Sequence, residues 1–253
     1  MVSVVILTHN EEETITDCLN SVKNWSDDII LVDYSTDETV KIARRLIPKS
    51  KLRIISDATQ NDFSFLRNRG LTLARHEWVL FLDADERVSL ELYREINEAT
   101  VSTICNGYYL RRQDFFLGKL LQYGETGNIR LLKLGKKTAG QWRRRVHEVW
   151  EINGQVGELT HPLEHRPHPT VAEFIARINR WTTLDAQEFY QAGKRSSWLK
   201  IIAYPKAKFL MNYFLKLGFM DGMPGLIMAL VMSFHSFLTR AKLYLLETNK
   251  QAV

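Results

Sequence analysis

The stretch from Trp78 to Arg87 constrains this chain more than any other. It reads Trp-Val-Leu-Phe-Leu-Asp-Ala-Asp-Glu-Arg, so a short unbroken apolar run leads directly into two carboxylates one residue apart. An apolar run of this length, bounded by polar residues, is typical of a strand buried on both faces, as in a parallel sheet. Ligands of open α/β sheets bind outside the carboxyl ends of the strands. The sequence therefore places Asp83 and Asp85 where a ligand would bind.

These two carboxylates repel each other unless a positive group lies between them. A hard divalent cation, bound by carboxylate oxygens and shared with a substrate diphosphate, meets that need. The alternative is an acidic turn at the end of the strand that caps the next helix. Because the Asp-X-Asp tripeptide is common by chance, the tripeptide alone leaves both interpretations open.

Three further apolar runs precede this strand and alternate with helical patterns. Strands are predicted over residues 2–7, 29–32 and 52–55, and each is followed by apolar residues at helical spacing. The second of these helices follows Ser35-Thr36-Asp37-Glu38, which has the Ser-X-X-Glu form of a capping box. Strands that alternate with helices at this period predict βαβ units, right-handed crossovers and a parallel sheet.

Polar residues follow three of the predicted strands. Thr8, Asn10 and Glu11 follow the first strand, Asp33 ends the second, and the acidic pair ends the fourth. Polar residues at the ends of three strands along one edge of a sheet are better explained by a ligand than by chance. A carboxylate such as Asp33 suits hydrogen bonds to a ribose or a base edge. No glycine-rich fingerprint follows the first strand, and no Gly-Lys-Ser phosphate loop is present, which argues against a dinucleotide site and a P-loop.

The sequence after Arg87 has a different pattern. A helix is predicted near residues 89–99, and the short, partly alternating runs at 107–112, 128–134 and 146–152 predict a mixed sheet that continues the first. Their loops are candidates for an acceptor-binding face.

Two histidine-bearing segments lie in the same half. Arg143–Glu148 carries basic residues beside a His-Glu pair, and a solvated turn is the alternative interpretation of this segment. His161, His165 and His168 crowd a proline-rich segment, and each is a candidate contact for a metal or a phosphate.

The C-terminal region is helical and basic. An amphipathic helix is predicted from Thr170, and residues 194–216 interleave lysines and arginines with aromatic residues. The apolar segment 223–238 that follows contains only 16 residues, against about 20 needed to cross a bilayer. We therefore expect residues 169–253 to form a helical region that lies on a membrane without crossing it, appended to a domain of residues 1–168. The alternative is that these helices pack on that domain or form a homo-oligomer.

Composition limits the partners. The net charge of +5 suits a phosphorylated ligand or an anionic membrane surface, and the absence of zinc-finger spacing argues against nucleic acid. Cys18 and Cys105 are expected to be reduced, packed thiols. The sequence opens on a predicted strand and not on a signal-peptide pattern, so a cytoplasmic protein, peripheral on the inner face of the cell membrane, is expected.

At this point the motifs match a known family. The chain resembles family-2 glycosyltransferases of the GT-A fold, particularly bacterial lipopolysaccharide-core β-1,4-glucosyltransferases. The matching segments are Val4–Glu11, Val32-Asp33, Ser35–Thr39, Arg67-Asn68, Leu80–Arg87, Val146–Glu148, His161–His165 and Phe214–Gly222. One departure is that such sequences usually carry Ser-Gly where Tyr34 stands alone here, so the second loop is one residue shorter.

The resemblance implies a fold and a reaction. The fold would be an α/β, Rossmann-like nucleotide-sugar-binding domain with a mostly parallel central sheet, plus a C-terminal helical extension. The reaction would be inverting transfer of a hexose, glucose first, from a UDP-sugar to a cell-envelope glycan or glycolipid such as lipopolysaccharide core. Mg²⁺ or Mn²⁺ would bridge the diphosphate.

The resemblance also assigns residues to roles. Those that would line the uridine pocket are Thr8, Asn10, Glu11, Asp33 and Arg67. Asp83 and Asp85 would bind the ribose and the metal, and Glu148 would deprotonate the acceptor hydroxyl. His147 would orient a phosphate or its loop, and Asp114 and Glu125 are the next candidates for the base.

Three other functions share parts of this pattern. A haloacid dehalogenase-type phosphatase also ends a strand in Asp-X-Asp, but it normally carries Thr or Val where Arg87 stands and has that strand near the start of its domain. A sugar-phosphate nucleotidyltransferase would carry a glycine-rich basic loop in place of residues 8–13. A non-catalytic nucleotide-sugar-binding or membrane scaffold protein is the third alternative, and the retained Asp83, Asp85 and Glu148 argue against it.

Overall fold

The fold was analysed in a computed structural model of the chain. Its description covers residues 1–56, 62–101, 104–144, 148–167 and 170–248. The chain forms two compact units, one of Met1–Asp114 with Ile129–His168 and one of Phe115–Asn128 with Pro169–Val253. The segment Phe115–Asn128 therefore groups with the C-terminal helices, whereas the sequence had placed it in a domain of residues 1–168.

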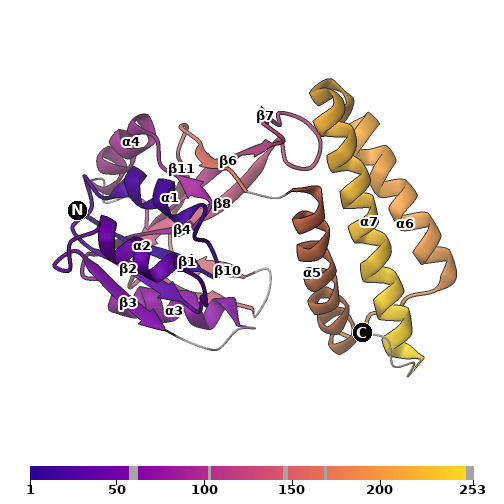
Figure 1. The fold of residues 1–253 in the computed structure, drawn as a ribbon, viewed down its shortest axis with the longest axis horizontal. Coiled ribbons are helices and arrows are strands. Elements are labelled where there is room, and N and C mark those ends of the chain that lie inside the picture. Colours follow the sequence, from indigo (N-terminus) through magenta and orange to yellow (C-terminus); the bar gives the residue numbers. More distant parts are fainter. Residues whose placement is uncertain (57–61, 102–103, 145–147, 168–169, 249–253) are drawn as a thin grey trace. The chain divides into compact units, whose positions relative to one another are not determined.

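The described part of the first unit is built on a mixed sheet (Figure 1). In spatial order its strands are β3 (Leu52–Ser56), β2 (Ile29–Asp33), β1 (Val2–Thr8), β4 (Trp78–Asp83), β8 (Ile129–Lys136), β6 (Gly107–Phe116), β12 (Leu163–His165) and β5 (Glu86–Arg87). The strands from β3 to β4 are parallel, and β8 is antiparallel to both β4 and β6. Two short strands also pair with β6, β11 (Val156–Glu158) within this unit and β7 (Lys119–Leu120) within the other. The predicted α/β fold with a mostly parallel sheet that continues as a mixed one is confirmed.

Helices cover both faces of the parallel strands. Helices α1 (Ile15–Val22), α2 (Thr39–Leu46) and α4 (Leu90–Val101) share a core with Val4 and Ile6 of β1. On the other face α3 (Phe63–Leu73) packs on the alternate residues of the same strand. Because successive strand residues point to opposite faces, an unbroken apolar strand supplies both cores.

Helix α3 lies unusually close to β1. A Cβ added at Gly70 would lie 2.4 Å from Cγ1 of Val5, so only a glycine fits at this crossing. Arg67 is on the same helix one turn earlier, and the close packing brings its side chain to the end of the sheet. The glycine therefore helps to set the position of a candidate site residue.

Two local predictions are wrong. The run at 146–152 does not extend the main sheet: β10 (Val149–Ile152) pairs with β9 (Gly140–Arg143) in a separate two-stranded sheet, and residues 145–147 lie outside the described part. Trp142 and Trp150 are buried beside Phe81 in the core on the α3 side, so this hairpin covers a sheet face instead of extending the sheet edge.

The predicted capping box does not form either. Helix α2 begins at Thr39, and its first turn is supported by Asp37, whose Oδ1 accepts from Thr39 N at 3.0 Å. The Ser35 hydroxyl instead donates to Asp33 Oδ1 at 2.6 Å. The strand-end carboxylate is therefore the stronger partner for this hydroxyl.

The second unit is mainly helical. Its described helices are α5 (Val171–Gln191), α6 (Trp198–Leu210), the π-turn η1 (Met211–Leu215), the 3₁₀ turn η2 (Gly218–Asp221) and α7 (Gly222–Glu247). Helix α7 packs against both α5 and α6 (Figure 1). Lys242 of α7 donates to the hydroxyls of Thr182 and Thr183 of α5 at 2.9 and 2.8 Å.

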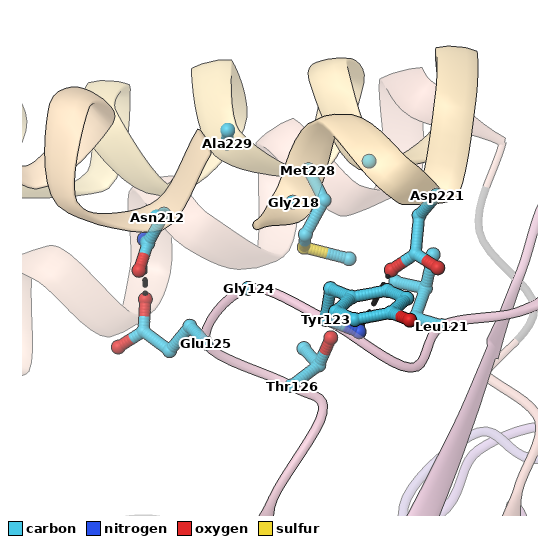
Figure 2. Close-up of a pocket in the computed structure, with 11 residues that line it drawn as sticks. Leu121, Tyr123, Gly124, Glu125, Thr126, Asn212, Gly218, Asp221, Met228 and Ala229 are labelled. Atoms are coloured by element: carbon cyan, nitrogen blue, oxygen red, sulfur yellow. Dashed lines mark hydrogen bonds between the residues drawn. The ribbon is translucent and has the colours of Figure 1, made fainter. Parts of the chain in front are cut away.

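Asp221 ties the segment Phe115–Asn128 to these helices. Its carboxylate accepts from the backbone N–H groups of Gln122 and Tyr123, and its carbonyl accepts from Lys119 Nζ at 2.8 Å. Figure 2 shows the cavity beside this contact, where the Asn212 amide faces Glu125. The cavity measures about 10 Å³, which is room for about one water molecule and too little for a sugar or a nucleotide.

Helix α7 is longer than the apolar segment on which the membrane prediction rested. It has 26 residues, and among the described residues the stretch Gly218–Glu247 is the one helical segment long and apolar enough to cross a bilayer by length and composition. The argument that the segment is too short to cross therefore does not hold for the folded helix.

Candidate active site

The strand ends that the sequence singled out lie side by side. In the register of the sheet Thr8 of β1 is level with Asp33 of β2, and Leu7 of β1 is level with Asp83 of β4. The carboxyl ends of these parallel strands thus form one edge, with an acid on each side of β1. This arrangement is the one expected for a ligand site of an open α/β sheet.

Asp33 is held by a short network of hydroxyls. Thr8 Oγ1 donates to its Oδ1 at 2.7 Å, and Ser35 contributes its hydroxyl and, at 3.1 Å, its backbone N–H. The Asn10 N–H in turn donates to the Ser35 hydroxyl, and Asn10 Oδ1 accepts from Thr36 N, both at 2.8 Å. These bonds join the two loops that follow β1 and β2 and orient the Asp33 carboxylate.

The shortened loop at Tyr34 is compact. The Tyr34 ring stacks on His9 with centroids 4.1 Å apart. In the loop that precedes α1, the backbone N–H of Glu11 donates to Thr39 Oγ1. The carboxylate of Glu11 accepts from the Thr14 hydroxyl at 2.7 Å. Glu11 therefore also has a structural role, because it joins the first loop to the starts of α1 and α2.

Arg67 joins two candidate residues from distant parts of the chain. Its Nη2 lies 2.9 Å from Asp83 Oδ1 and 2.8 Å from Glu148 Oε1, and its Nε donates to the same Glu148 oxygen at 2.9 Å. The guanidinium lies over the Trp142 ring, with its carbon 4.7 Å from the ring centroid. Arg67 thus lies beneath the acidic edge of the sheet and holds Glu148 close to Asp83.

Two buried residues of the site were missed by the sequence analysis. Lys133 of β8 donates to Asp83 Oδ2 and to Glu86 Oε2, both at 2.8 Å, and both Lys133 and Glu86 are buried. Glu86 Oε2 also accepts from Asp83 N at 2.8 Å. Lys133 interrupts an apolar run between Leu132 and Leu134, and that interruption was the one signal available in the sequence.

The charged groups in this cluster shift one another's pKa values. Burial alone would raise the pKa of Asp83, but Lys133 and Arg67 outweigh it and hold that pKa far below its usual range. Burial, with Asp83 close by, raises the pKa of Glu86. Burial would lower the pKa values of Lys133 and Arg67, yet the neighbouring carboxylates raise both. Asp83 is therefore a firmly ionised carboxylate that two cations already contact.

Asp85 belongs to a second cluster that the sequence did not predict as a unit. His165 Nε2 lies 3.3 Å from Asp85 Oδ2, and His165 Nδ1 pairs with Asp114 Oδ1. Arg112 Nε is 3.1 Å from the same Asp114 oxygen. Burial would lower the pKa of His165, but the charge of Asp85 and the bond to Asp114 raise it to about 9.

The donor set fits a cation that is shared with a substrate. Among the described residues there is no cluster of three or more His, Cys, Asp and Glu side chains that could hold a metal ion. Mg²⁺ sites in enzymes that bind phosphorylated substrates use one or two carboxylates, with the remaining oxygens coming from phosphates and water. Asp83 already contacts two cations, and the less exposed Asp85 contacts His165. Two carboxylates match the number that such a site uses.

The remaining predicted residues have other partners or lie outside the description. Glu125 belongs to the second unit, where it pairs with Lys208 and accepts from Asn212 at 3.1 Å. His161 pairs with Glu95 at 2.9 Å. His147 and His168 lie outside the described residues.

Comparisons with known proteins find relatives among glycosyltransferases. The chain is 28% identical over 254 residues to the "Lipopolysaccharide core biosynthesis glycosyltransferase LpsC" of Rhizobium meliloti (strain 1021), covering 96% of this chain and 91% of that protein. It is 41% identical over 101 residues to the SPbeta prophage-derived glycosyltransferase SunS of Bacillus subtilis (strain 168), covering 40% of this chain and 22% of that protein.

A solved structure shares the fold. S. aureus TarS, residues 1–349, in complex with UDP-GlcNAc, superposes with a TM-score of 0.53 at 15% identity, covering 98% of this chain and 92% of that one. Finally, the family described as "Glycosyl transferase family 2" matches residues 3–145, more than half of the 253 residues. The chain belongs to glycosyl transferase family 2.

Proposed function

We propose that this protein transfers a hexose, glucose first, from a UDP-sugar to a cell-envelope glycan or glycolipid such as lipopolysaccharide core, with inversion at the anomeric carbon. The observation that carries the proposal is the edge where Arg67 joins Asp83 to Glu148, with Asp33 on the other side of β1. The donor class is supported by family membership and by the fold shared with a protein solved with UDP-GlcNAc. The acceptor class is supported by the printed name of the relative LpsC.

The donor would bind along the carboxyl ends of β1, β2 and β4. In this proposal Thr8, Asn10, Glu11 and Asp33 line the uridine pocket, where the hydroxyl network already orients Asp33. Arg67 closes that pocket from α3. Asp83 binds the ribose.

Asp85 would hold a divalent cation, Mg²⁺ or Mn²⁺, with Asp83 beside it. When bound, such a cation stabilises the charge that develops on the departing diphosphate, a Lewis-acid contribution of several kcal/mol.

Glu148 would act on the acceptor. The new bond forms between the acceptor oxygen and the anomeric carbon, the bond from that carbon to the diphosphate breaks, and Glu148 takes the proton of the acceptor hydroxyl. A positioned base typically contributes about 10²–10⁴-fold. Arg67 fixes the orientation of the Glu148 carboxylate through two contacts to one oxygen, Oε1.

A thermal-shift panel tests the donor site. A ligand that binds only the folded state raises the free energy of unfolding by about 2.7 kcal/mol at 100 times its Kd. UDP and UDP-glucose should therefore raise Tm more than GDP or ADP does, and Mn²⁺ should enlarge the shift. Asp85→Ala should lower the ligand-free Tm, because it removes a carboxylate partner of the largely buried His165, and it should lose the Mn²⁺-dependent part of the ligand shift. The control Asp27→Ala, at a half-exposed acid away from this edge, should behave as wild type. Equal shifts for all nucleotides, or a full Mn²⁺ effect in Asp85→Ala, would contradict the proposal.

We further propose that the second unit lies on the inner membrane surface. Exposed apolar side chains gather around the η1 and η2 turns: Phe214, Leu215, Leu217, Phe219, Met220 and Met223. Leu215 is 80% exposed, and Lys216 beside it is exposed as well. Apolar residues next to lysines suit a helix corner at headgroup depth, where each Lys near an anionic leaflet adds about 1 kcal/mol.

The contacts of α7 favour a peripheral arrangement over a crossing one. His235 lies 3.4 Å from Asp185 of α5, and Lys242 donates to α5 hydroxyls at 2.8–2.9 Å. A crossing α7 would lose these contacts or carry the charged α5 into the bilayer, and charges in the hydrocarbon core are costly.

Flotation with liposomes tests the membrane surface in the full chain. Leu215→Ser combined with Phe214→Ser should abolish flotation with anionic vesicles, while Val101→Ser, an exposed apolar residue of the first unit, should not change it. Wild type should be released by high salt or carbonate. Flotation that survives the double substitution, or a dimer that the double substitution dissociates, would contradict a membrane-binding corner.

A further inference from the structure

Two arginines face each other across strands β6 and β8. In the register of this antiparallel pair Arg111 is directly opposite Arg130, so both side chains lie on the same face of the sheet. Both residues are exposed. Like charges at directly opposite positions destabilise a strand pair. The sheet itself therefore gains nothing from this pair, whereas an anion bound between the two guanidinium groups would replace repulsion with attraction.

The positive charge of the pair is only partly neutralised. Glu158 of β11 contacts Arg130, with 2.9 Å between its Oε2 and Nη1. In the part of the chain that the structure describes, Arg111 has no hydrogen-bond or ion-pair partner. Its guanidinium therefore presents its donors to solvent. The planar fork of an arginine binds a carboxylate or a phosphate through two parallel hydrogen bonds, and this geometry makes arginine selective for such anions.

The arginine pair lies on the face of the sheet that carries the candidate base. Leu132, two residues after Arg130 on β8, packs in the same core as Trp142, and residues two apart on a strand share a face. The Arg67 guanidinium, which holds the Glu148 carboxylate, lies over the Trp142 ring. The arginine pair and Glu148 are therefore on the side of the sheet covered by α3.

The spacing along β8 places the pair beside the donor site and outside it. Arg130 is three residues before Lys133, which corresponds to roughly 10 Å of strand. Lys133 contacts Asp83, which the proposed function assigns to the donor ribose. Tyr109, two residues before Arg111 on the same face of β6, is 41% exposed and offers a ring on which a sugar can pack. An acceptor sugar next to the reacting one would meet these side chains.

We propose that Arg111 and Arg130 form an anion-binding subsite for the acceptor, which takes a carboxylate or phosphate group carried by a sugar of the glycan. The inference rests on the proposed function, in which the acceptor hydroxyl meets Glu148. Charge-assisted hydrogen bonds from the two guanidinium groups would hold the acidic sugar. The neighbouring hydroxyl would thereby be brought to the base, and a glycan without an acidic group would bind more weakly.

Calorimetric titration of an oligosaccharide into UDP-saturated protein tests the subsite independently of turnover. The probe is lipopolysaccharide core from a Gram-negative cell, deacylated with alkali so that its carboxylates and phosphates remain. One sample is dephosphorylated with hydrogen fluoride, one has its carboxylates converted to neutral amides with carbodiimide and methylamine, and one receives both treatments.

Arg111→Gln should weaken binding of the untreated oligosaccharide about tenfold, the loss expected for a hydrogen bond to a charged group. It should bind the doubly treated oligosaccharide within twofold of wild type, because the anion that Arg111 contacts is gone. The single treatment that removes the difference between the two proteins identifies the anion as a phosphate or a carboxylate. UDP affinity should be unchanged, and the ligand-free Tm should be equal to or above that of wild type, since a repulsion is relieved.

Arg44→Gln is the matched control. It makes the same change of charge at an exposed arginine of α2, which covers the opposite face of the sheet, and it should bind every sample as wild type does. Binding of the untreated oligosaccharide by Arg111→Gln within twofold of wild type would overturn the subsite.

Equal losses for the untreated and doubly treated samples would also overturn it, in favour of a structural role for Arg111. A tenfold loss of UDP affinity would overturn it in favour of a contact to the donor diphosphate. Wild-type protein that binds the oligosaccharide through Arg111, but releases no UDP from UDP-glucose in its presence, would instead overturn the proposed transfer and leave the subsite standing.

Discussion

At the scale of single residues, Lys133 is the cation shared by two carboxylates, the buried Glu86 and the partly exposed Asp83. It contacts Asp83 and Glu86 at 2.8 Å, and its side chain is 4% exposed. Removing one partner of a buried pair costs about 3–5 kcal/mol, because the remaining charge is left uncompensated. Lys133→Met should therefore lower the free energy of unfolding by that amount in urea denaturation, and adding Glu86→Gln should restore part of it. Lys136→Met, at a lysine 4.0 Å from the largely exposed Glu77, should change it by less than about 1 kcal/mol. Equal losses in the two single variants would contradict this account.

A substitution of Glu148 tests its proposed role as the base, also at the scale of single residues. Glu148→Gln keeps the size of the side chain and removes its capacity to take a proton, so kcat should fall about 10²–10⁴-fold. Affinity for the UDP-sugar should change little. Glu151→Gln, at an exposed acid on β10, the strand that follows Glu148, serves as the control, and both values come from steady-state UDP release. If Glu148→Gln kept its kcat within tenfold of wild type, the base would be another carboxylate, and Asp114 would be the next to test.

The sequence predicted the positions of residues at the strand ends, where the contacts are local. Asp83 and Asp85 follow directly from a buried strand, and Thr8 with Asp33 from the ends of its parallel neighbours. Lys133 reaches Asp83 across an antiparallel pairing of strands 50 residues apart in sequence, and no local pattern specifies that register. The same holds for His165, whose partners follow from the pairing of β12 with β6 and β5.

At the scale of secondary-structure elements, the approach of α3 to β1 sets the position of Arg67. A Cβ at Gly70 would overlap Val5 Cγ1 at 2.4 Å, so Gly70→Ala must shift the helix or the strand. Overpacking of this kind costs about 1–3 kcal/mol. Thermal and urea unfolding should show this loss, and UDP affinity should fall as Arg67 moves. Thr72→Ala, on the exposed face of the same helix, should stay within about 0.5 kcal/mol of wild type, and a neutral Gly70→Ala would mean that the contact is not tight.

Helix α4 is linked to the loop before β12 by Glu95. The Glu95 carboxylate accepts from the backbone N–H groups of Thr160 and His161 at 2.7 and 2.8 Å. Burial alone would raise the pKa of Glu95, but these bonds outweigh it and lower that pKa. Because the folded pKa lies below the unfolded value of about 4.3, the carboxylate stabilises the fold above pH ~4.3, and this contribution is lost as pH falls through the folded pKa.

Glu95→Gln should accordingly lower the free energy of unfolding by about 1 kcal/mol at pH 7. The gap from wild type should shrink as the pH falls below about 4.3, as measured by urea denaturation at pH 7, 5 and 4. Glu98→Gln, on the exposed side of the same helix, should show no such trend. A difference in the free energy of unfolding between Glu95→Gln and wild type that grows as the pH falls would contradict this account.

Element prediction failed where a tertiary partner overrode a local signal. The Ser35 hydroxyl binds Asp33 instead of capping α2. The run that includes β10 pairs with β9, and the hairpin buries Trp142 and Trp150 edge-on against Phe81. Likewise, the segment Phe115–Asn128 groups with the second unit, where the Asp221 carboxylate accepts hydrogen bonds from its backbone. No sequence pattern predicts these contacts.

At the scale of the whole molecule, the two units have different surfaces that suit different tasks. The first unit presents acids at strand ends backed by buried cations, which suits a nucleotide sugar. The second presents apolar side chains and lysine at a helix corner, which suits a lipid surface. A donor site in one unit and membrane residence through the other would confine the enzyme to the surface that holds a glycolipid acceptor.

Transfer itself tests the central claim most directly. Purified full-length protein would be incubated with UDP-glucose labelled in the sugar, Mn²⁺ and envelope glycolipid from a Gram-negative cell, and label in the extracted glycolipid would be counted against UDP released. The account predicts equal amounts of both in wild type, a loss of at least about 100-fold in Glu148→Gln and in Asp85→Ala, and wild-type transfer in Glu151→Gln. Undiminished transfer by Asp85→Ala and Glu148→Gln together would contradict it.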